Sequence, residues 1–511
     1  MEGQGRRSSL LQLLREDRLL LAGTLILSAA TLAPLAATPF LPLHDLPSHV
    51  GLSSVLFDVV REKGLAAASY QAHLYPLPYW TLTLLLAALS PLIGPLLAAK
   101  VAVACALLAV PLGTMRLLAA LGRSPRLALL SFALVWDYNT YWGFVAFVMG
   151  VGLCQFALAG LVEARSVREA VRGWPLIVLL AFTHAQATGL FLVLGLAASL
   201  CGPRIVERLR CFAASAAATG VMFVPWLGVR LAASAGRPMP EHPFDFQGPL
   251  EKLERFFEYS LDTIPEQPGQ TTKFLSLVVC VVLPALLLLV RQRPAGDRDR
   301  IAFVMVAASF AMFMLLPFNM SWPFDQWSID RRHATPLLLS LLAIPRPDLD
   351  RWRAAWLAPG VAVTAAVAVS VTLQFASFGE RARPFQQVID AVPRDKAVLT
   401  LTLDDYDPAV TLWPFNQFHA YILAEKGGYD PFVINYPSYA VVFRPGKGRP
   451  APNANAMKEF SFASHGVHYD YLLVQGKDWD PLVPAPVAGG KTVRQVLEAG
   501  RWRLYEVVPS P

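Results

Sequence analysis

The sequence predicts an all-α polytopic membrane protein with about eleven spans, followed by a small soluble α/β domain. Three observations support this fold class. Hydrophobic residues make up 55% of the 511 residues and charged residues only 16%, a balance too apolar for a soluble fold of this size. Apolar runs of about 20 residues, the length at which a helix crosses a bilayer, recur along the chain. After Gly379 the pattern changes to short β-rich runs separated by turn residues.

The candidate spans follow from these runs. The first comes after several arginines and is longer than a signal-peptide core, so we interpret it as a membrane anchor. Residues 174–201 are long for one span and short for two, but arginines flank both ends, so we expect two short legs with an outer turn at residues 183–186. The full set is 18–41, 95–118, 127–142, 143–164, 174–187, 188–201, 211–231, 273–291, 301–317, 329–345 and 355–376.

Arginine-rich segments indicate the orientation. Together with the N-terminus they hold 20 Lys and Arg against 10 acidic residues, whereas the intervening segments up to Gly379 hold 10 against 13. Cytoplasmic loops carry the excess of positive charge, so the N-terminus and these segments should be cytoplasmic, in a cell inner or plasma membrane. An odd number of crossings then places the C-terminal part outside. The arginine-rich segments are 116–126, 163–172, 204–210, 291–300 and 346–353.

Two units are therefore predicted, a transmembrane domain at residues 1–379 with its first outer loop at 42–94, and an extracytoplasmic soluble α/β domain at 380–511. The second unit carries 14 Lys and Arg against 14 acidic residues, so the net charge of +7 belongs to the membrane part. This distribution does not favour a nucleic-acid partner. Its expected strands are 397–403, 469–474 and 502–508, with a helix at 415–425.

The segment that follows the first predicted span carries the most informative polar residues. Residues 42–49 place His44, Asp45 and His49 directly at the outer membrane surface, and an apolar piece at 79–92, too short to span, is expected to lie in the interface. A trio of this kind could bind a metal, but it lacks a fourth ligand. All five cysteines lie in or beside apolar runs, so no zinc spacing or disulfide framework is predicted.

With this loop and this arrangement the chain resembles the GT-C superfamily of glycosyltransferases, which includes the protein O-mannosyltransferases and the bacterial aminoarabinose transferases. The resemblance covers the architecture of most of the chain. It implies a catalytic acidic residue early in the first outer loop, juxtamembrane helices in the rest of that loop, and a soluble domain after the last span. The family often has an Asp-Glu-like pair where this chain has His44 and Asp45, so a second carboxylate is absent.

Asp45 is the predicted catalytic carboxylate, with His44 beside it. A carboxylate near the anomeric carbon of a lipid-linked sugar can act as general base for the acceptor. The leaving phosphate needs a cation, and arginine donates paired hydrogen bonds to phosphate oxygens. Arg331 and Arg332, just outside a predicted span, are the candidates, and the family tends to have a basic residue at this juncture. Asp45 could instead cap a loop helix, and the arginines could be interface anchors.

Four further residues are predicted to contact substrate. They are His49, Tyr138, His184 and Gln186. Histidines placed as His44 and His49 are more often polar loop residues than ligands, and the His184–Gln186 pair could equally form a structural hydrogen bond. Tyr138 belongs to an aromatic group with Trp136, Tyr141 and Trp142, for which an interfacial belt is the main interpretation and a sugar-stacking platform the minority one.

These features favour a glycosyltransferase that moves a sugar from a polyprenyl-phosphate donor to an acceptor at the outer membrane surface. The acceptor could be a glycan, a lipid or a protein. The resemblance implies inverting transfer with no metal and no cofactor. A transporter would need ionisable residues near the middle of several spans, whereas the charges here sit at span ends and in loops. A receptor or noncatalytic scaffold would place function beyond residue 380.

Overall fold

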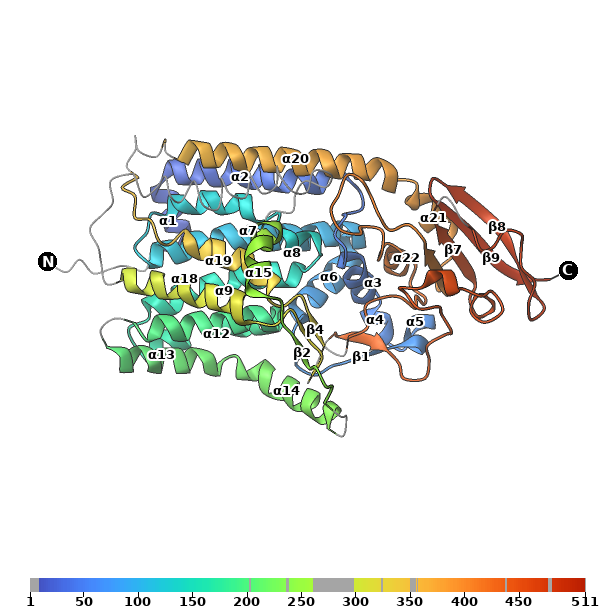
Figure 1. Ribbon diagram of the computed structural model, residues 1–511, viewed down its shortest axis with the longest axis horizontal. Helices are drawn as coiled ribbons and strands as arrows, with labels where there is room; N and C mark the ends of the chain where they lie inside the picture. Colours follow the sequence, from blue (N-terminus) through green and yellow to red (C-terminus); the bar gives the residue numbers. More distant parts are fainter. Residues whose placement is uncertain are drawn as a thin grey trace.

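The computed structural model describes residues 9–201, 204–235, 239–260, 298–322, 325–349, 355, 357–436, 439–476 and 480–510. The long helices lie side by side as a bundle, with the N-terminus at one end and strands β7, β8 and β9 at the other (Figure 1). The predicted span at 273–291 lies outside the described residues. The prediction of a mostly helical membrane protein is confirmed.

The helices of the bundle follow the apolar runs of the sequence. Within the described residues, α2, α7, α9 and α20 are long and apolar enough to cross a membrane, and the pair α13 and α14, bent by 58°, would be a fifth span. The bounds are α1 Leu10–Glu16, α2 Arg18–Ala37, α7 Pro95–Ala120, α9 Val145–Glu163, α10 Val167–Val171, α11 Trp174–Thr183, α12 Ala185–Ser199, α13 Ile205–Ala217, α14 Gly220–Ser234, α18 Arg298–Leu315, α19 Ala334–Leu341 and α20 Ala358–Ala382. The total of about eleven spans stays a prediction.

Two predicted spans have a different local structure. The run at 127–142 forms a 3₁₀ helix, η1 Pro125–Leu134, and then the single turn α8 Tyr138–Tyr141. Asp137 separates them because its carboxylate caps α8 by accepting a hydrogen bond from the Thr140 amide (3.0 Å). The run at 329–345 begins as the 3₁₀ turn η3 Arg331–His333 before α19. Helices α11 and α12 meet at His184, inside the predicted outer turn.

Ion pairs join the loops at the end of the bundle near the N-terminus. The Arg123 guanidinium lies 2.6 Å from a carboxylate oxygen of Asp299, and Arg346 contacts the other oxygen at 2.7 Å. Arg126 contacts Asp17 at 2.6 Å. Segments that the charge pattern assigned to one membrane side therefore lie together in space.

Close packing of α7 against α9 depends on two glycines. A Cβ atom on Gly152 would lie 2.4 Å from the carbonyl carbon of Ala109, and one on Gly113 would lie 2.4 Å from the carbonyl oxygen of Gly152. Small residues let helix backbones approach this closely in a membrane, where packing contacts hold helices together.

We expect Gly152→Leu to destabilise the protein by about 1–3 kcal/mol, because the new side chain must push α7 away from α9. Thermal inactivation of the purified protein measures this effect. Gly160→Leu in the same helix is the matched control, since nothing lies within 4 Å of its Cβ position. Equal stability of the two variants would contradict the packing argument.

The first outer loop folds onto the C-terminal residues. It contains α3 Leu46–Ser54, α4 Leu56–Val60, α5 Gly64–Ser69, β1 Tyr70–Ala72 and α6 Trp80–Ile93. Strand β1 pairs antiparallel with β6 (Val441–Phe443), and Leu56 and Tyr70 share a buried cluster with Leu399 and Leu423. The loop and the C-terminal segment therefore have a common core, which fixes the C-terminal residues over one end of the bundle.

The C-terminal segment contains a four-stranded sheet. Its strand order is β5-β7-β9-β8, with β5 and β7 parallel and the other pairs antiparallel. The remaining elements are α21 Phe385–Ala391, β5 Val398–Thr402, α22 Ala420–Lys426, β7 Tyr471–Gln475, β8 Lys491–Ala499 and β9 Trp502–Pro509. A separate small sheet joins β2 Phe244–Asp245, β3 Asn319–Met320 and β4 Gln326–Trp327, which lie between helices along the chain.

Candidate active site

Asp45 is held at the mouth of the bundle by main-chain hydrogen bonds. The amides of His44 and Asp45 donate to the carbonyls of Tyr141 (2.9 Å) and Trp142 (3.0 Å). The next residue, Gly143, has φ +78°, and a Cβ there would lie 2.8 Å from the Asp45 nitrogen, so only glycine fits this approach. Asp45 stands at the start of α3, yet its side chain makes no capping hydrogen bond. The carboxylate is therefore not used as a helix cap.

A cavity of about 340 Å³ opens beside this carboxylate. Residues from the loop at 42–94, from the segments that carry β3, β4 and η3, from the bundle and from the C-terminal segment form its walls. They are Asp45, His49, Tyr79, Phe144, Ala146, Phe147, His184, Asn319, Asp325, Gln326, Trp327, Arg332, Tyr436 and Tyr439. The cavity thus brings together four of the predicted site residues, Asp45, His49, His184 and Arg332.

The surroundings of Asp45 suit a proton acceptor. Its side chain is 18% exposed. Burial raises the pKa of the Asp45 carboxyl to about 7, against the opposing attraction of the Arg332 charge. A general base works best when its pKa lies near the working pH. Burial also lowers the pKa of His49 to about 4, so His49 is neutral in this cavity at neutral pH.

Arg332 presents a cation to the same cavity. Its guanidinium stacks over the Phe144 ring at 3.7 Å and donates to the carbonyl of Trp327 (3.1 Å). A second nitrogen lies 3.4 Å from Nε2 of His184. Among the described residues the buried Nε of Arg332 has no hydrogen-bond partner, and buried donors are normally satisfied. Arg332 therefore keeps hydrogen-bonding capacity for an anion.

Aromatic rings form one wall of the cavity. The Tyr439 ring lies 5.2 Å from His49 and 5.3 Å from Tyr79, and Tyr79 lies 5.0 Å from His184. Tyr79 has φ +74°, an unusual conformation for a residue other than glycine. Tyr436 and Tyr439 come from the C-terminal segment, so the cavity is complete only when that segment covers the bundle.

Comparison with known proteins shows the fold. ArnT from Cupriavidus metallidurans, crystallised bound to undecaprenyl phosphate, superposes with a TM-score of 0.50 and 12% sequence identity over 95% of this chain and 97% of that chain. This chain therefore shares the overall fold of ArnT. ArnT in the apo state gives the same TM-score at 13% identity and the same coverage. Arabinofuranosyltransferase AftD from mycobacteria gives 0.48 at 14% identity, over 96% of this chain and 41% of that chain. No protein-family model and no curated protein sequence matches the chain.

Four predicted site residues do not line the cavity. The His44 ring is 3.7 Å from the Asp45 carboxylate, and its Nδ1 lies 3.0 Å from the carbonyl of Trp413. Gln186 donates to the carbonyl of Ile329 (2.6 Å), and its side-chain nitrogen is 3.0 Å from a ring nitrogen of His333. The remaining two are Tyr138 and Arg331.

Tyr138 and Arg331 make their contacts outside the cavity lining. The Tyr138 hydroxyl is 3.1 Å from that of Ser328, and the Arg331 guanidinium packs over the rings of Phe318 (4.3 Å) and Tyr259 (4.9 Å). The prediction that the aromatic group around Tyr138 forms an interfacial belt is wrong. All four of its residues, Trp136, Tyr138, Tyr141 and Trp142, are buried inside the protein. The ring of Trp136, for example, packs 5.2 Å from Phe375 of α20.

Several cavity residues were not predicted. Asp325 and Gln326 lie in an outer stretch whose polarity was visible in the sequence, but nothing there distinguished them from neighbouring residues. Tyr436 and Tyr439 reach the cavity through the pairing of β1 with β6, which no local pattern reveals. The described residues contain no group of three or more His, Cys, Asp or Glu that could hold a metal ion.

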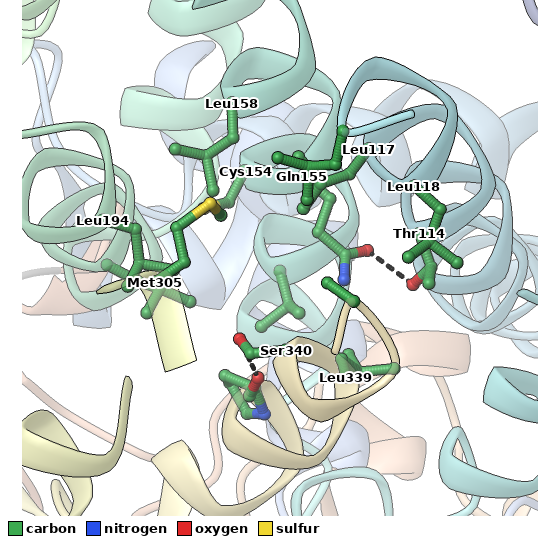
Figure 2. Close-up of a pocket in the computed structure, with 15 residues that line it drawn as sticks. Thr114, Leu117, Leu118, Cys154, Gln155, Leu158, Leu194, Met305, Leu339 and Ser340 are labelled. Atoms are coloured by element: carbon green, nitrogen blue, oxygen red, sulfur yellow. Dashed lines mark hydrogen bonds between the residues drawn. The ribbon is translucent and has the colours of Figure 1, made fainter. Parts of the chain in front are cut away.

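A second, enclosed cavity of about 20 Å³ lies within the bundle between α7, α9, α12, α18 and α19 (Figure 2). Thr114 and Gln155 form a hydrogen bond there at 3.0 Å, and the Ser340 hydroxyl pairs with that of Ser309 at 2.9 Å. Its lining contains no Asp, Glu, Lys, Arg or His. This cavity therefore lacks the ionisable groups expected along a transport pathway.

Proposed function

We propose that the chain is a glycosyltransferase that moves a sugar from a polyprenyl-phosphate donor to an acceptor at the outer membrane surface. The observation that carries this proposal is the placement of the Asp45 carboxylate and the Arg332 guanidinium in a single cavity at the outer end of a GT-C-like bundle. ArnT, which shares the fold, was crystallised with undecaprenyl phosphate, which supports a lipid of this class as the carrier.

The chemistry assigns one role to each group. The acceptor hydroxyl or amine attacks the anomeric carbon, its proton passes to the Asp45 carboxylate, and the bond between that carbon and the phosphate oxygen breaks. The electron pair leaves with the polyprenyl phosphate, whose added charge Arg332 stabilises through charge-assisted hydrogen bonds. The neutral rings of His49 and the tyrosine wall enclose the sugar.

The tail of the donor requires an apolar path. An open groove of about 960 Å³ lies between α6 and α11, and its lining is almost entirely apolar, with Trp80, Leu84 and Phe182 among its residues. Trp80 follows Tyr79 of the cavity in the chain, so the groove and the cavity are neighbours. We propose that the polyprenyl tail lies there while the phosphate faces Arg332.

The direct test uses the purified protein in nanodiscs with undecaprenyl-phosphate-linked pentoses and hexoses. We expect at least one of them to be consumed with release of undecaprenyl phosphate when a cell-envelope glycan, lipid or protein fraction is added. Failure to bind undecaprenyl phosphate together with failure to consume every donor would refute the proposal.

Arg332 rather than Arg331 is proposed as the phosphate-binding residue. Arg332→Ala should weaken binding of undecaprenyl phosphate by about 1.5–3 kcal/mol, because it removes a hydrogen bond to a charged group. Arg331→Ala is the matched control, since the neighbouring guanidinium packs on Phe318 and Tyr259 outside the cavity. Titration of each variant in nanodiscs gives the affinities. A larger loss in the Arg331 variant would reverse the assignment.

The proposed topology places the N-terminus in the cytoplasm and a soluble α/β domain, residues 380–511, outside. It rests on the charge bias of the loops and on the opposite positions of the N-terminus and the four-stranded sheet in the bundle (Figure 1). In a cysteine-free background, an impermeant maleimide on intact cells should label Ser464→Cys and not Ser124→Cys. Labelling of the second position alone would overturn the orientation.

A further inference from the structure

A second polar cleft lies in the C-terminal segment, outside the site described above. Its volume is about 720 Å³. The cleft lies beyond the carboxyl ends of β5 and β7, where Asp404 and Asp405 follow one strand and Gly476 follows the other. The loop at residues 454–459 and the side chain of Asn416 complete its lining.

The topology places this cleft where α/β sheets bind ligands. Strand β5 pairs in parallel with β7 on one side and has a parallel bridge between Ala397 and Tyr429 on the other. The chain leaves β5 through α22 to Tyr429 and later returns as β7 on the opposite side. The strand order therefore reverses at β5, and ligands of open α/β sheets bind in the crevice at such a reversal, outside the carboxyl ends of the strands.

The cleft offers several hydrogen-bond acceptors and one cation. Asp404, Asp405 and Glu459 line it, together with Lys458 and the side-chain amides of Asn416 and Asn455; the Asp404 carboxylate also pairs with Arg501. Carboxylate and amide oxygens accept hydrogen bonds, so this lining suits a ligand rich in hydroxyl groups.

Asn416 connects the cleft with the candidate active site. Its side-chain nitrogen lies 3.5 Å from Nε2 of His44, and the same Nε2 is 3.7 Å from the Asp45 carboxylate. Trp413, three residues earlier, is 46% exposed and its ring lies 6.2 Å from that of His44. A chain molecule seated in the cleft could therefore extend past an exposed indole toward Asp45.

We infer that this cleft binds the acceptor, and that the acceptor is a carbohydrate chain whose end reaches Asp45. This inference rests on the proposed function, because it assigns the second substrate of the same reaction. The cleft holds the body of the glycan through its hydroxyl groups, and the cavity receives the terminal hydroxyl that attacks the donor sugar. The outer domain thereby selects the acceptor while the bundle binds the lipid.

A glycan array carrying bacterial surface oligosaccharides tests the inference with the full chain in nanodiscs. We expect the wild type to retain at least one glycan. Asp405→Asn, which removes one charged acceptor, and Asn455→Trp, which fills the cleft from an exposed loop position, should each weaken that binding by about tenfold or more. Glu498→Gln on the exposed face of β8 is the control and should bind as the wild type does.

Two further readouts separate this inference from the proposed function. The affinity for undecaprenyl phosphate should be the same in wild type and cleft variants, and Asp45→Asn should retain the glycan. Glycan binding without any sugar transfer would refute the proposed function and leave the cleft as a glycan-binding site without a transfer reaction. The cleft assignment fails if the wild type retains no glycan, or if both cleft variants bind glycan as tightly as the wild type.

Discussion

Asp45→Asn is expected to slow sugar transfer by about 10²–10⁴-fold, the usual contribution of a general base. Asparagine keeps the shape of the side chain but cannot accept the acceptor's proton. Because the Asp45 side chain makes no capping hydrogen bond in α3, its replacement removes no helix cap. Binding of undecaprenyl phosphate should therefore persist, and steady-state transfer kinetics beside that binding assay measure the effect.

The pH dependence gives an independent check on the same residue. Burial raises the pKa of Asp45 to about 7, and only the ionised form can take a proton. The transfer rate should therefore fall as the pH drops below about 7. In Asp45→Asn this dependence of the rate on acid pH should be absent. If Asp45→Asn transfers sugar at the wild-type rate, or if its rate still falls below about pH 7, Asp45 is not the general base.

Asp45→Asn should lower the transfer rate but should not lower the stability of the folded protein. A carboxyl whose pKa is higher in the folded protein than in the unfolded chain binds protons more tightly when folded, so its contribution to stability falls as the pH rises from about 4 to about 7. Asparagine removes this penalty. Asp45→Asn should consequently unfold at the wild-type temperature or above it at pH 8, and a lower unfolding temperature would show that loss of activity came from loss of structure.

The sequence predicted the parts of this protein that local patterns determine. The apolar runs that became α2, α7, α9 and α20 are visible because the length of a span is set by the bilayer. The break at His184 was predicted from charge on both flanks of a run of unsuitable length. Strands β5, β7 and β9 correspond to predicted β-rich runs.

Local sequence patterns could not decide which of Arg331 and Arg332 faces the cavity. The two residues share one 3₁₀ turn, in which successive side chains point about 120° apart, so one faces the cavity and the other packs on rings outside it. Helical periodicity also could not separate the 3₁₀ helix η1 from a spanning α-helix, since both show an apolar run. The tyrosine wall needs contacts between residues more than 350 positions apart, such as Tyr79 with Tyr439.

The segment that carries Arg332 is fixed by a buried ion pair. The ammonium of Lys252 lies 3.0 Å from a carboxylate oxygen of Asp330, and both side chains are 1% exposed. The other oxygen of Asp330 accepts a hydrogen bond from the Arg331 amide (2.8 Å) and so anchors the start of η3. Lys252 also donates to the carbonyl of Leu316 (2.6 Å) at the end of α18. This lysine, on α15 (Pro249–Ser260), therefore ties three segments together beneath the cavity.

We expect Lys252→Met to destabilise the protein by about 3–5 kcal/mol, because it leaves a buried carboxylate without its counter-ion. A double variant that also carries Asp330→Leu should recover part of this loss, since replacing both partners removes the uncompensated charge; the carbonyls at the end of α18 stay without their donor. Arg255→Met in the same helix is the matched control, because its ion pair with Glu251 is exposed and such pairs contribute about 0.2–1 kcal/mol. Thermal unfolding of the three variants in one detergent measures the differences. If the unfolding temperature of Lys252→Met falls no further below the wild type than that of Arg255→Met, the buried pair does not stabilise the segment that carries Arg332.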